Sequence, residues 1–342
     1  MKKRLIVFLG VLICCIELEA QSPKIDKEQF FIENNTLKAS LVLPMGKLLN
    51  HTAAGKATLN ARFICKLPDS SLADEKILVD LRGHFRRETC LIPPLKLVFD
   101  KPAPNIFSPL KTLKLVSTCK TSSDYPQYLI KEYLIYKMYN LFTEKSFRVR
   151  LLDLNYVDSS GKKKTMNNFA FFIEDEKEMA KRNDCKNDEE GKPPTESTNR
   201  SQMTLVAIFE YMIGNTDWSV PARHNIKTIR SKTDPGKLYT VPYDFDFSGL
   251  VNTDYSIPDP LMNTESVLER VYRGFPRTLE EINLVLEEFR KQKENIYAIV
   301  EQCTYLEKRH KQMMTSYLDD FYNEIKYPAK VKSIFIDNAR TK

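Results

Sequence analysis

Two short stretches of the chain hold the side chains best suited to chemistry. Residues 214–225 include Asp217 and Asn225, and residues 241–249 include Asp244 and Asp246. Phosphoryl transfer needs a carboxylate to orient or deprotonate the attacking hydroxyl, and oxygen ligands that hold Mg²⁺ on the phosphates. Asp217, Asn225 and Asp244 can supply these three groups. Asn and Asp are also common in ordinary turns, so a purely structural interpretation stays open.

Predicted elements place these residues on loops that flank one hairpin. The apolar segment 203–213 is a predicted helix ending at Gly214, because glycine is favoured directly after a helix. Residues 225–229 and 238–242 are predicted strands joined by a turn at 233–236. Asp217 therefore precedes the hairpin, Asn225 begins it, and Asp244 follows it.

The elements before this hairpin are mostly predicted strands. Apolar alternation at 41–43, 57–65, 77–81, 93–99 and 113–116 indicates a largely antiparallel sheet, and a helix follows at about 126–141. Three more strands precede residue 175. Thr278 and Glu281 form a capping box that begins one of the long helices near the end of the chain.

The chain divides into four predicted parts. They are a signal peptide (1–20), a β-rich part with one helix (21–182), a polar loop (183–202) and a mainly helical catalytic part (203–342). The signal peptide rests on Lys2, Lys3 and Arg4, the apolar run 5–16, and Leu18-Glu19-Ala20 before the expected cleavage. We therefore expect a secreted or periplasmic protein, without a transmembrane segment once the signal is removed.

Composition narrows the function classes. With 342 residues, 42% of them hydrophobic, the chain is long enough to bury a core. The net charge of +7 comes from scattered basic residues, so we do not expect nucleic acid as a partner. Few histidines and no CxxC pair argue against a zinc site. Cys90 and Cys119 flank predicted neighbouring strands that could bring them within disulfide range; two separate buried thiols are the alternative.

An ordered set of short motifs resembles the CotH kinase-like family, an atypical branch of the protein-kinase-like superfamily. The set covers about residues 55–275. The matching stretches are 81–87, Cys90 with 93–95, 113–116, 131–134, 147–150, 214–217, 224–225 and 243–246. The resemblance implies an α+β, two-lobed protein-kinase-like fold, with a β-rich N-lobe and a mainly helical C-lobe.

The resemblance also implies roles for individual residues. Asp217 matches the catalytic Asp, Asn225 a metal-binding Asn and Asp244 a metal-binding Asp, with Asp246 as a competing assignment. Lys114 matches the lysine that contacts ATP phosphates, and Glu132 its helical partner. In the nearest equivalent of the missing glycine-rich loop, Arg82, Arg86 and Arg87 could bind phosphates instead; a solvated strand end is the alternative. Lys96 and Lys120 compete with Lys114 for the phosphate-binding role.

The implied function is phosphoryl transfer from ATP, with Mg²⁺ or Mn²⁺, to a protein or another hydroxyl-bearing acceptor. Whether the protein is an enzyme stays open. The leading alternative is a non-catalytic, pseudokinase-like scaffold at the cell envelope or surface. A second alternative is a β-rich module that binds carbohydrate or envelope components.

Overall fold

The computed structural model describes residues 27–50, 58–67, 70–83, 85–100, 105–122, 124–189 and 191–340. The expected signal peptide lies outside these residues and stays a prediction. No helix in the described ranges is long and apolar enough to cross a membrane.

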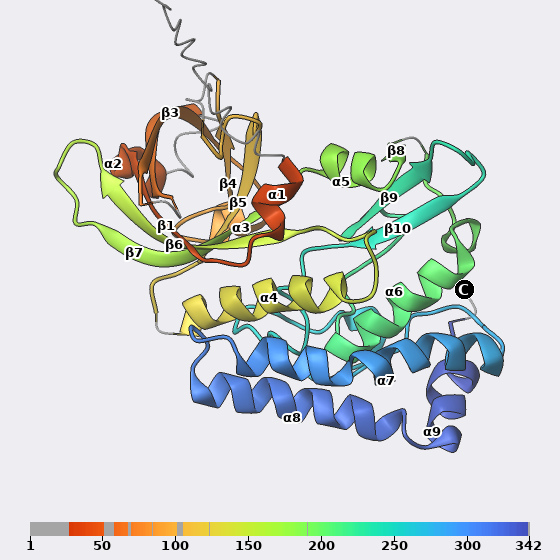
Figure 1. Ribbon diagram of the computed structural model, residues 1–342. Coiled ribbons are helices and arrows are strands. Elements are labelled where there is room, and N and C mark those ends of the chain that lie inside the picture. The colour runs from red at the N-terminus through yellow and green to blue at the C-terminus, as the bar shows by residue number, and fades with distance from the viewer. Residues whose placement is uncertain are drawn as a thin grey trace, which may run out of the picture.

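Strands of the first half close into a seven-stranded barrel in the order β1-β2-β3-β4-β5-β7-β6 (Figure 1). All neighbouring pairs are antiparallel except β1 with β6, which are parallel and close the sheet. The strands are β1 (Leu37–Leu43), β2 (Thr58–Lys66), β3 (Leu72–Leu81), β4 (Leu95–Val98), β5 (Thr112–Ser117), β6 (Val149–Asp158) and β7 (Met166–Ile173).

Barrel closure shows that the predicted two-lobed protein-kinase-like fold is wrong. The chain is α+β, as expected, but its strands form a closed mixed barrel rather than the β-sheet of a kinase N-lobe. The difference arises because β1 pairs with β6 along its whole length, from Leu37 opposite Leu152 to Leu43 opposite Asp158. A pairing between segments so distant in sequence leaves no local pattern in either strand.

Alternation along the barrel strands separates an apolar interior from a polar exterior. In β2 and β3, buried and exposed side chains alternate residue by residue, as expected for strands with one buried face. Aromatic rings fill the interior: the Phe63 ring lies 5.3 Å from Phe107 and 5.9 Å from Phe172. The barrel is therefore a packed core and leaves its outer face to contact the rest of the molecule.

The longer helices, α4, α6, α7 and α8, pack beneath the barrel (Figure 1). The long helix α4 lies between the barrel strands β6 and β7 and the helix α7, and α6 packs against both α7 and α8. The helices are α1 (Lys27–Ile32), α2 (Met45–Leu49), α3 (Phe85–Thr89), α4 (Asp124–Asn140), α5 (Glu176–Arg182), α6 (Arg200–Ile213), α7 (Leu279–Glu301), α8 (Lys308–Glu324) and α9 (Pro328–Lys332).

The local signals near the expected site are confirmed. Strands β9 (Ile226–Ser231) and β10 (Leu238–Pro242) form the predicted hairpin. Gly214 ends α6 with a φ of 65°, in the left-handed region that glycine adopts at low cost. The capping box of Thr278 and Glu281 begins α7.

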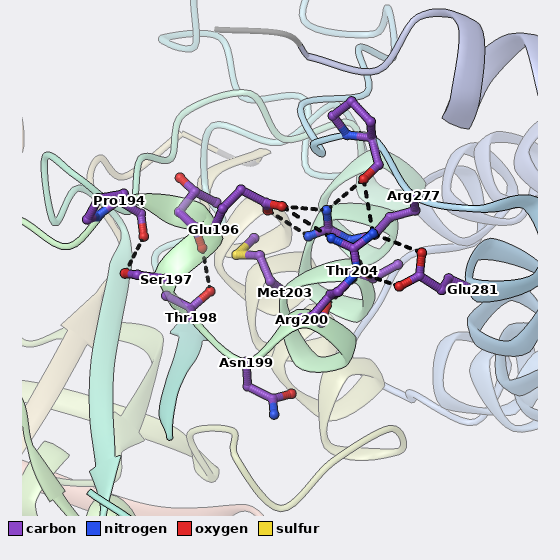
Figure 2. A network of polar contacts seen from close by, with 12 residues as sticks. Pro194, Glu196, Ser197, Thr198, Asn199, Arg200, Met203, Thr204, Arg277 and Glu281 are labelled. Atoms are coloured by element: carbon purple, nitrogen blue, oxygen red, sulfur yellow. Dashed lines mark hydrogen bonds and ion pairs between the residues drawn. The ribbon is translucent and has the colours of Figure 1, made fainter. Parts of the chain in front are cut away.

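The described residues of the polar segment 183–202 contact neighbouring elements. It includes β8 (Cys185–Asn187), which pairs with β9, and the short 3₁₀ helix η1 (Thr195–Ser197). Figure 2 shows Glu196 of η1 facing Arg277, whose Nη2 and Nη1 lie 2.7 and 2.8 Å from the two carboxylate oxygens. Arg277 Nε also donates to Thr204 Oγ1 of α6 at 2.8 Å. These hydrogen bonds tie the segment to the residues that precede α7.

Cys90 and Cys119 form a disulfide, which confirms the expected crosslink. Their Cα atoms are 4.4 Å apart, within the range that such a bond spans. The bond links the residue after α3 to the segment that follows β5. Both cysteines are buried.

Candidate functional site

Asp217 is held from several sides in the loop after α6. Its backbone nitrogen donates to Asn215 Oδ1 at 3.0 Å. Asn225 Nδ2 donates to the main-chain oxygen of Asp217 at 2.8 Å and to Oδ2 at 2.9 Å. His224 Nε2 lies 2.7 Å from the other carboxylate oxygen, Oδ1. Two neighbours therefore fix the direction of the Asp217 carboxylate.

The hairpin brings Asn225 beside the turn that carries Asp244. Ile226 pairs with Pro242, and the next backbone contact is the Tyr243 nitrogen donating to the Asn225 oxygen at 3.0 Å. Asn225 and Asp244 have φ values of 50° and 62°. This left-handed backbone is uncommon for non-glycine residues, although Asn and Asp tolerate it best. The structure thus places Asp217, Asn225 and Asp244 together, as the sequence predicts.

Asp244 is a half-buried carboxylate without a side-chain hydrogen bond or ion pair among the described residues. Its backbone nitrogen donates to the Tyr136 hydroxyl of α4 at 2.8 Å. Burial raises the pKa of Asp244 to about 7, and repulsion from Asp246 and Asp217 adds to the rise, while Arg86 and Arg82 oppose it. Such a carboxylate gains most from a positive ion that binds directly to it.

Asp246 and Glu132 face one buried arginine. Asp246 Oδ2 accepts a hydrogen bond from the Tyr255 hydroxyl at 3.0 Å, and Arg86 Nη1 lies 3.9 Å from both Asp246 Oδ2 and Glu132 Oε2. Burial raises the pKa of Glu132 well above its ordinary value, and repulsion from Asp246 raises it further. Asp246 is therefore enclosed by protein groups, whereas Asp244 is half-buried.

The expected pairing of Lys114 with Glu132 is not present, since Arg86 is the cation opposite Glu132. Lys114 lies on the outer side of β5, where its side chain alternates with the inward-facing Leu113 and Leu115. Burial lowers the pKa of Lys114, and repulsion from nearby Arg82 lowers it further. The strand face, rather than the residue type, decides which carboxylate a lysine can reach.

Arg82 and Lys114 form a pair of neighbouring cations, of which Arg82 lies close to Asp244. Burial lowers the pKa of Arg82, while attraction to Asp244 acts in the opposite direction. The structure gives neither side chain an ion pair within the residues it describes. The competing lysines lie elsewhere: Lys96 Nζ is 3.7 Å from Asp80 Oδ2, and Lys120 lies over the Tyr125 ring at 5.2 Å from its centroid.

Several residues that shape the site have no separate role among the predictions made from the sequence. His224 is adjacent to Asn225 in the sequence, and this adjacency was the available signal. Tyr136 falls in the apolar pattern of a helix and Tyr255 in a polar segment, so nothing in the sequence marked them as partners of Asp244 and Asp246. Arg86 was one of three arginines considered for phosphate contact, and its position between two carboxylates needs the fold.

Glu210 is a further buried acid, next to the loop that carries Asp217. It lies on α6, is 1% exposed, and neither carboxylate oxygen has a hydrogen-bond partner among the described residues. Burial raises the pKa of Glu210 to about 8, with smaller opposing effects from Asn215 and Arg273. Asn215 in turn accepts the hydrogen bond from Asp217 N, so Glu210 packs behind the catalytic candidate.

We expect Glu210→Gln to make the free energy of unfolding less dependent on pH. Between about pH 5 and 8 the folded chain retains a proton on Glu210 that the unfolded chain releases, so wild-type stability falls as pH rises. Glutamine does not ionise, and the variant should gain on the order of 3 kcal/mol over wild type across this range. Urea unfolding at pH 5 and pH 8 measures the difference. The matched control is Glu280→Gln at an exposed position of α7. Equal pH dependence in wild type and Glu210→Gln would contradict the assignment.

Comparison with known proteins adds no identification. No protein-family model matches the chain, and no curated protein matches it. The function therefore has to be argued from the site itself.

The site offers oxygen ligands of the kind that Mg²⁺ and Mn²⁺ prefer. Within the described ranges, no group of three or more His, Cys, Asp or Glu side chains is arranged to hold a metal ion. Mg²⁺ usually takes only one or two protein carboxylates and completes its shell with water and substrate phosphates. Asp244 supplies one carboxylate. Asn225 Oδ1 supplies an amide oxygen, because its Nδ2 is already directed at Asp217. The donor set fits a metal that is shared with a nucleotide.

Proposed function

We propose that the protein transfers a phosphoryl group from ATP, with Mg²⁺ or Mn²⁺, to a hydroxyl of a protein or another acceptor. The observation that carries this proposal is the half-buried Asp244 carboxylate, which has no side-chain hydrogen bond or ion pair among the described residues and lies close to Asn225, Asp217 and Arg82. Its pKa is raised by burial, and repulsion from nearby carboxylates adds to the rise. A divalent cation bound to nucleotide phosphates would relieve that repulsion and would supply positive charge to the transferring group.

Each side chain has a defined task in this proposal. Asp244 and the Asn225 amide oxygen hold the metal. Arg82 and Lys114 bind phosphate oxygens, for which two neighbouring cations without an ion pair in the described part of the chain are well suited. Asp217 accepts a hydrogen bond from the acceptor hydroxyl and directs its lone pair toward the phosphorus, as a positioned carboxylate does in phosphoryl transfer. His224 and Asn225 keep the Asp217 carboxylate in one orientation.

A non-catalytic scaffold is the second candidate, and one observation favours it. Both carboxylate oxygens of Asp217 already have protein partners, His224 and Asn225, which would also suit a purely structural carboxylate. Membership of the CotH kinase-like family and export by a signal peptide remain parts of the proposal. The closed barrel is not the fold that this resemblance implied.

The test is phosphoryl transfer from labelled ATP. Purified protein is incubated with γ-labelled ATP and Mn²⁺ or Mg²⁺, and label is followed on the protein itself and on added hydroxyl-bearing acceptors. Calorimetry measures ATP affinity with and without the metal. We expect metal-dependent binding and transfer. Metal-dependent binding without transfer would favour the scaffold, and the absence of both would refute the proposed site.

A further inference from the structure

We propose that the Cys90–Cys119 disulfide is part of the site's construction, because it holds Arg86 and Tyr255 against Asp246. Arg86 is then a positioning residue: it acts through Asp246 and the turn that carries Asp244. The effect on nucleotide binding rests on the proposed function, whereas the positional effect on residues 243–247 does not.

Arg86 is fixed to the barrel as well as to the two carboxylates. Its Nη2 donates to the main-chain oxygen of Ser117, the last residue of β5, at 2.7 Å. Its Nη1 lies 3.9 Å from Asp246 and from Glu132. Burial acts to lower the pKa of Arg86, but Tyr255, Asp246 and Glu132 outweigh it and raise the pKa above its ordinary value. The guanidinium therefore stays charged and joins β5, α4 and the Asp246 turn.

The disulfide is the covalent support of this arginine. Arg86 lies on α3, a helix of five residues that ends immediately before Cys90. Cys119 lies two residues beyond Ser117, the residue that Arg86 contacts. Main-chain hydrogen bonds join the same segments: Leu91 N donates to the Cys119 oxygen at 2.8 Å, and Cys90 N donates to the Arg86 oxygen at 3.0 Å. A helix of one turn has little stability of its own. The disulfide therefore fixes the position of Arg86.

The same disulfide also supports the second partner of Asp246. Cys90, Cys119 and Tyr125 form a small buried cluster, and Tyr255 packs against it. The rings of Tyr125 and Tyr255 are stacked with centroids 6.2 Å apart, and the Tyr255 hydroxyl donates to Asp246 Oδ2. Arg86 and Tyr255 both contact the Asp246 carboxylate. Both of these contacts therefore depend on the Cys90–Cys119 disulfide.

Removing the crosslink should loosen the Asp244–Asp246 turn without changing any charge. The variant Cys90→Ala/Cys119→Ala keeps Arg86, Asp246 and Glu132, so a change in ligand affinity reports position rather than net charge. We expect it to weaken Mn²⁺·ATP binding about tenfold, the lower end of what second-layer contacts contribute at metal sites. Arg86→Lys also keeps the charge, but one ammonium cannot match the fork of a guanidinium. It should produce a similar loss.

The combined variant separates the proposed connection from two independent effects. If the disulfide acts through Arg86, adding Arg86→Lys to the cysteine variant should lower affinity by less than the product of the two separate losses. Reduction of wild type by dithiothreitol should have the same effect as the double substitution. In that reaction the S–S bond becomes two thiols, and the reagent is oxidised to its cyclic disulfide. Cys303→Ala, at a free cysteine, is the matched control and should bind as wild type does.

Hydrogen exchange gives a readout that does not depend on ligand binding. In the cysteine variant, amides of residues 243–247 should exchange faster than in wild type, while those of the distant helix α8 should be unchanged. Unchanged exchange in 243–247, in a variant that has lost the disulfide and remains folded by circular dichroism, overturns the inference. If exchange changes as expected but wild type binds no Mn²⁺·ATP, the inference stands and the proposed function fails.

Discussion

Asp217→Ala should lower the rate of phosphoryl transfer by about 10²- to 10⁴-fold while leaving ATP affinity within about twofold of wild type. The carboxylate orients the acceptor hydroxyl, an interaction that matters in the chemical step and not in nucleotide binding. Transfer of label from ATP, together with calorimetry in the presence of Mn²⁺, separates the two quantities.

The control for Asp217 lies at the other end of the same hairpin. Asp234 occupies the turn between β9 and β10, where it pairs with Lys237, and Asp234→Ala should leave transfer unchanged. Wild-type rates in Asp217→Ala would refute the assigned role even if binding remained metal-dependent. A loss of ATP affinity equal to the loss of rate would place Asp217 in the binding site instead.

Asp244→Asn should abolish metal-dependent ATP binding, with a loss of at least about 100-fold in affinity. Asparagine keeps the shape of the side chain and tolerates the left-handed backbone, so the turn should persist. Calorimetry at fixed ATP with increasing Mn²⁺ measures the loss.

Since the pKa of Asp244 is raised to about 7, wild-type stability falls as pH rises toward 7. The variant should lack this fall and unfold at higher urea concentration at pH 8.

Asp246→Asn distinguishes the two competing metal assignments. Its carboxylate is enclosed by Tyr255 and Arg86, so its loss should destabilise the fold, because Arg86 then loses one of its two anionic partners. If Asp246→Asn abolished metal dependence and Asp244→Asn did not, the two roles would be reversed.

Local signals predicted the parts of the site that are close in sequence. Gly214, the β9–β10 hairpin and the capping box of α7 each depend on a few neighbouring residues whose conformational preferences are strong. The hairpin alone brings Asn225 beside Asp244, because the pairing of β9 with β10 places the start of one strand next to the end of the other. For this reason the grouping of Asp217, Asn225 and Asp244 could be anticipated before the fold was known.

The predictions that were wrong depend on contacts between segments that are distant in the sequence. Closure of the barrel needs β1 beside β6, and the alternation in each strand is the same in an open sheet and in a barrel. Lys114 was paired with Glu132 by resemblance, but α3 carries Arg86 into that position. A helix of five residues is too short to show the 3.6-residue period, so the sequence pattern did not predict α3.

The parallel pairing of β1 with β6 also sets the order in which the molecule can assemble. Leu37, the first residue of β1, is synthesised early. Its partner Leu152 and the last residue of β6, Asp158, are synthesised much later. Until then β1 can pair only with β2, and the β1 edge of the growing sheet, like the β5 edge, stays open to other chains. Loop closure over so long a separation is slow compared with forming local hairpins. We therefore expect the barrel to close late, and a chain interrupted before β6 to aggregate through that open edge.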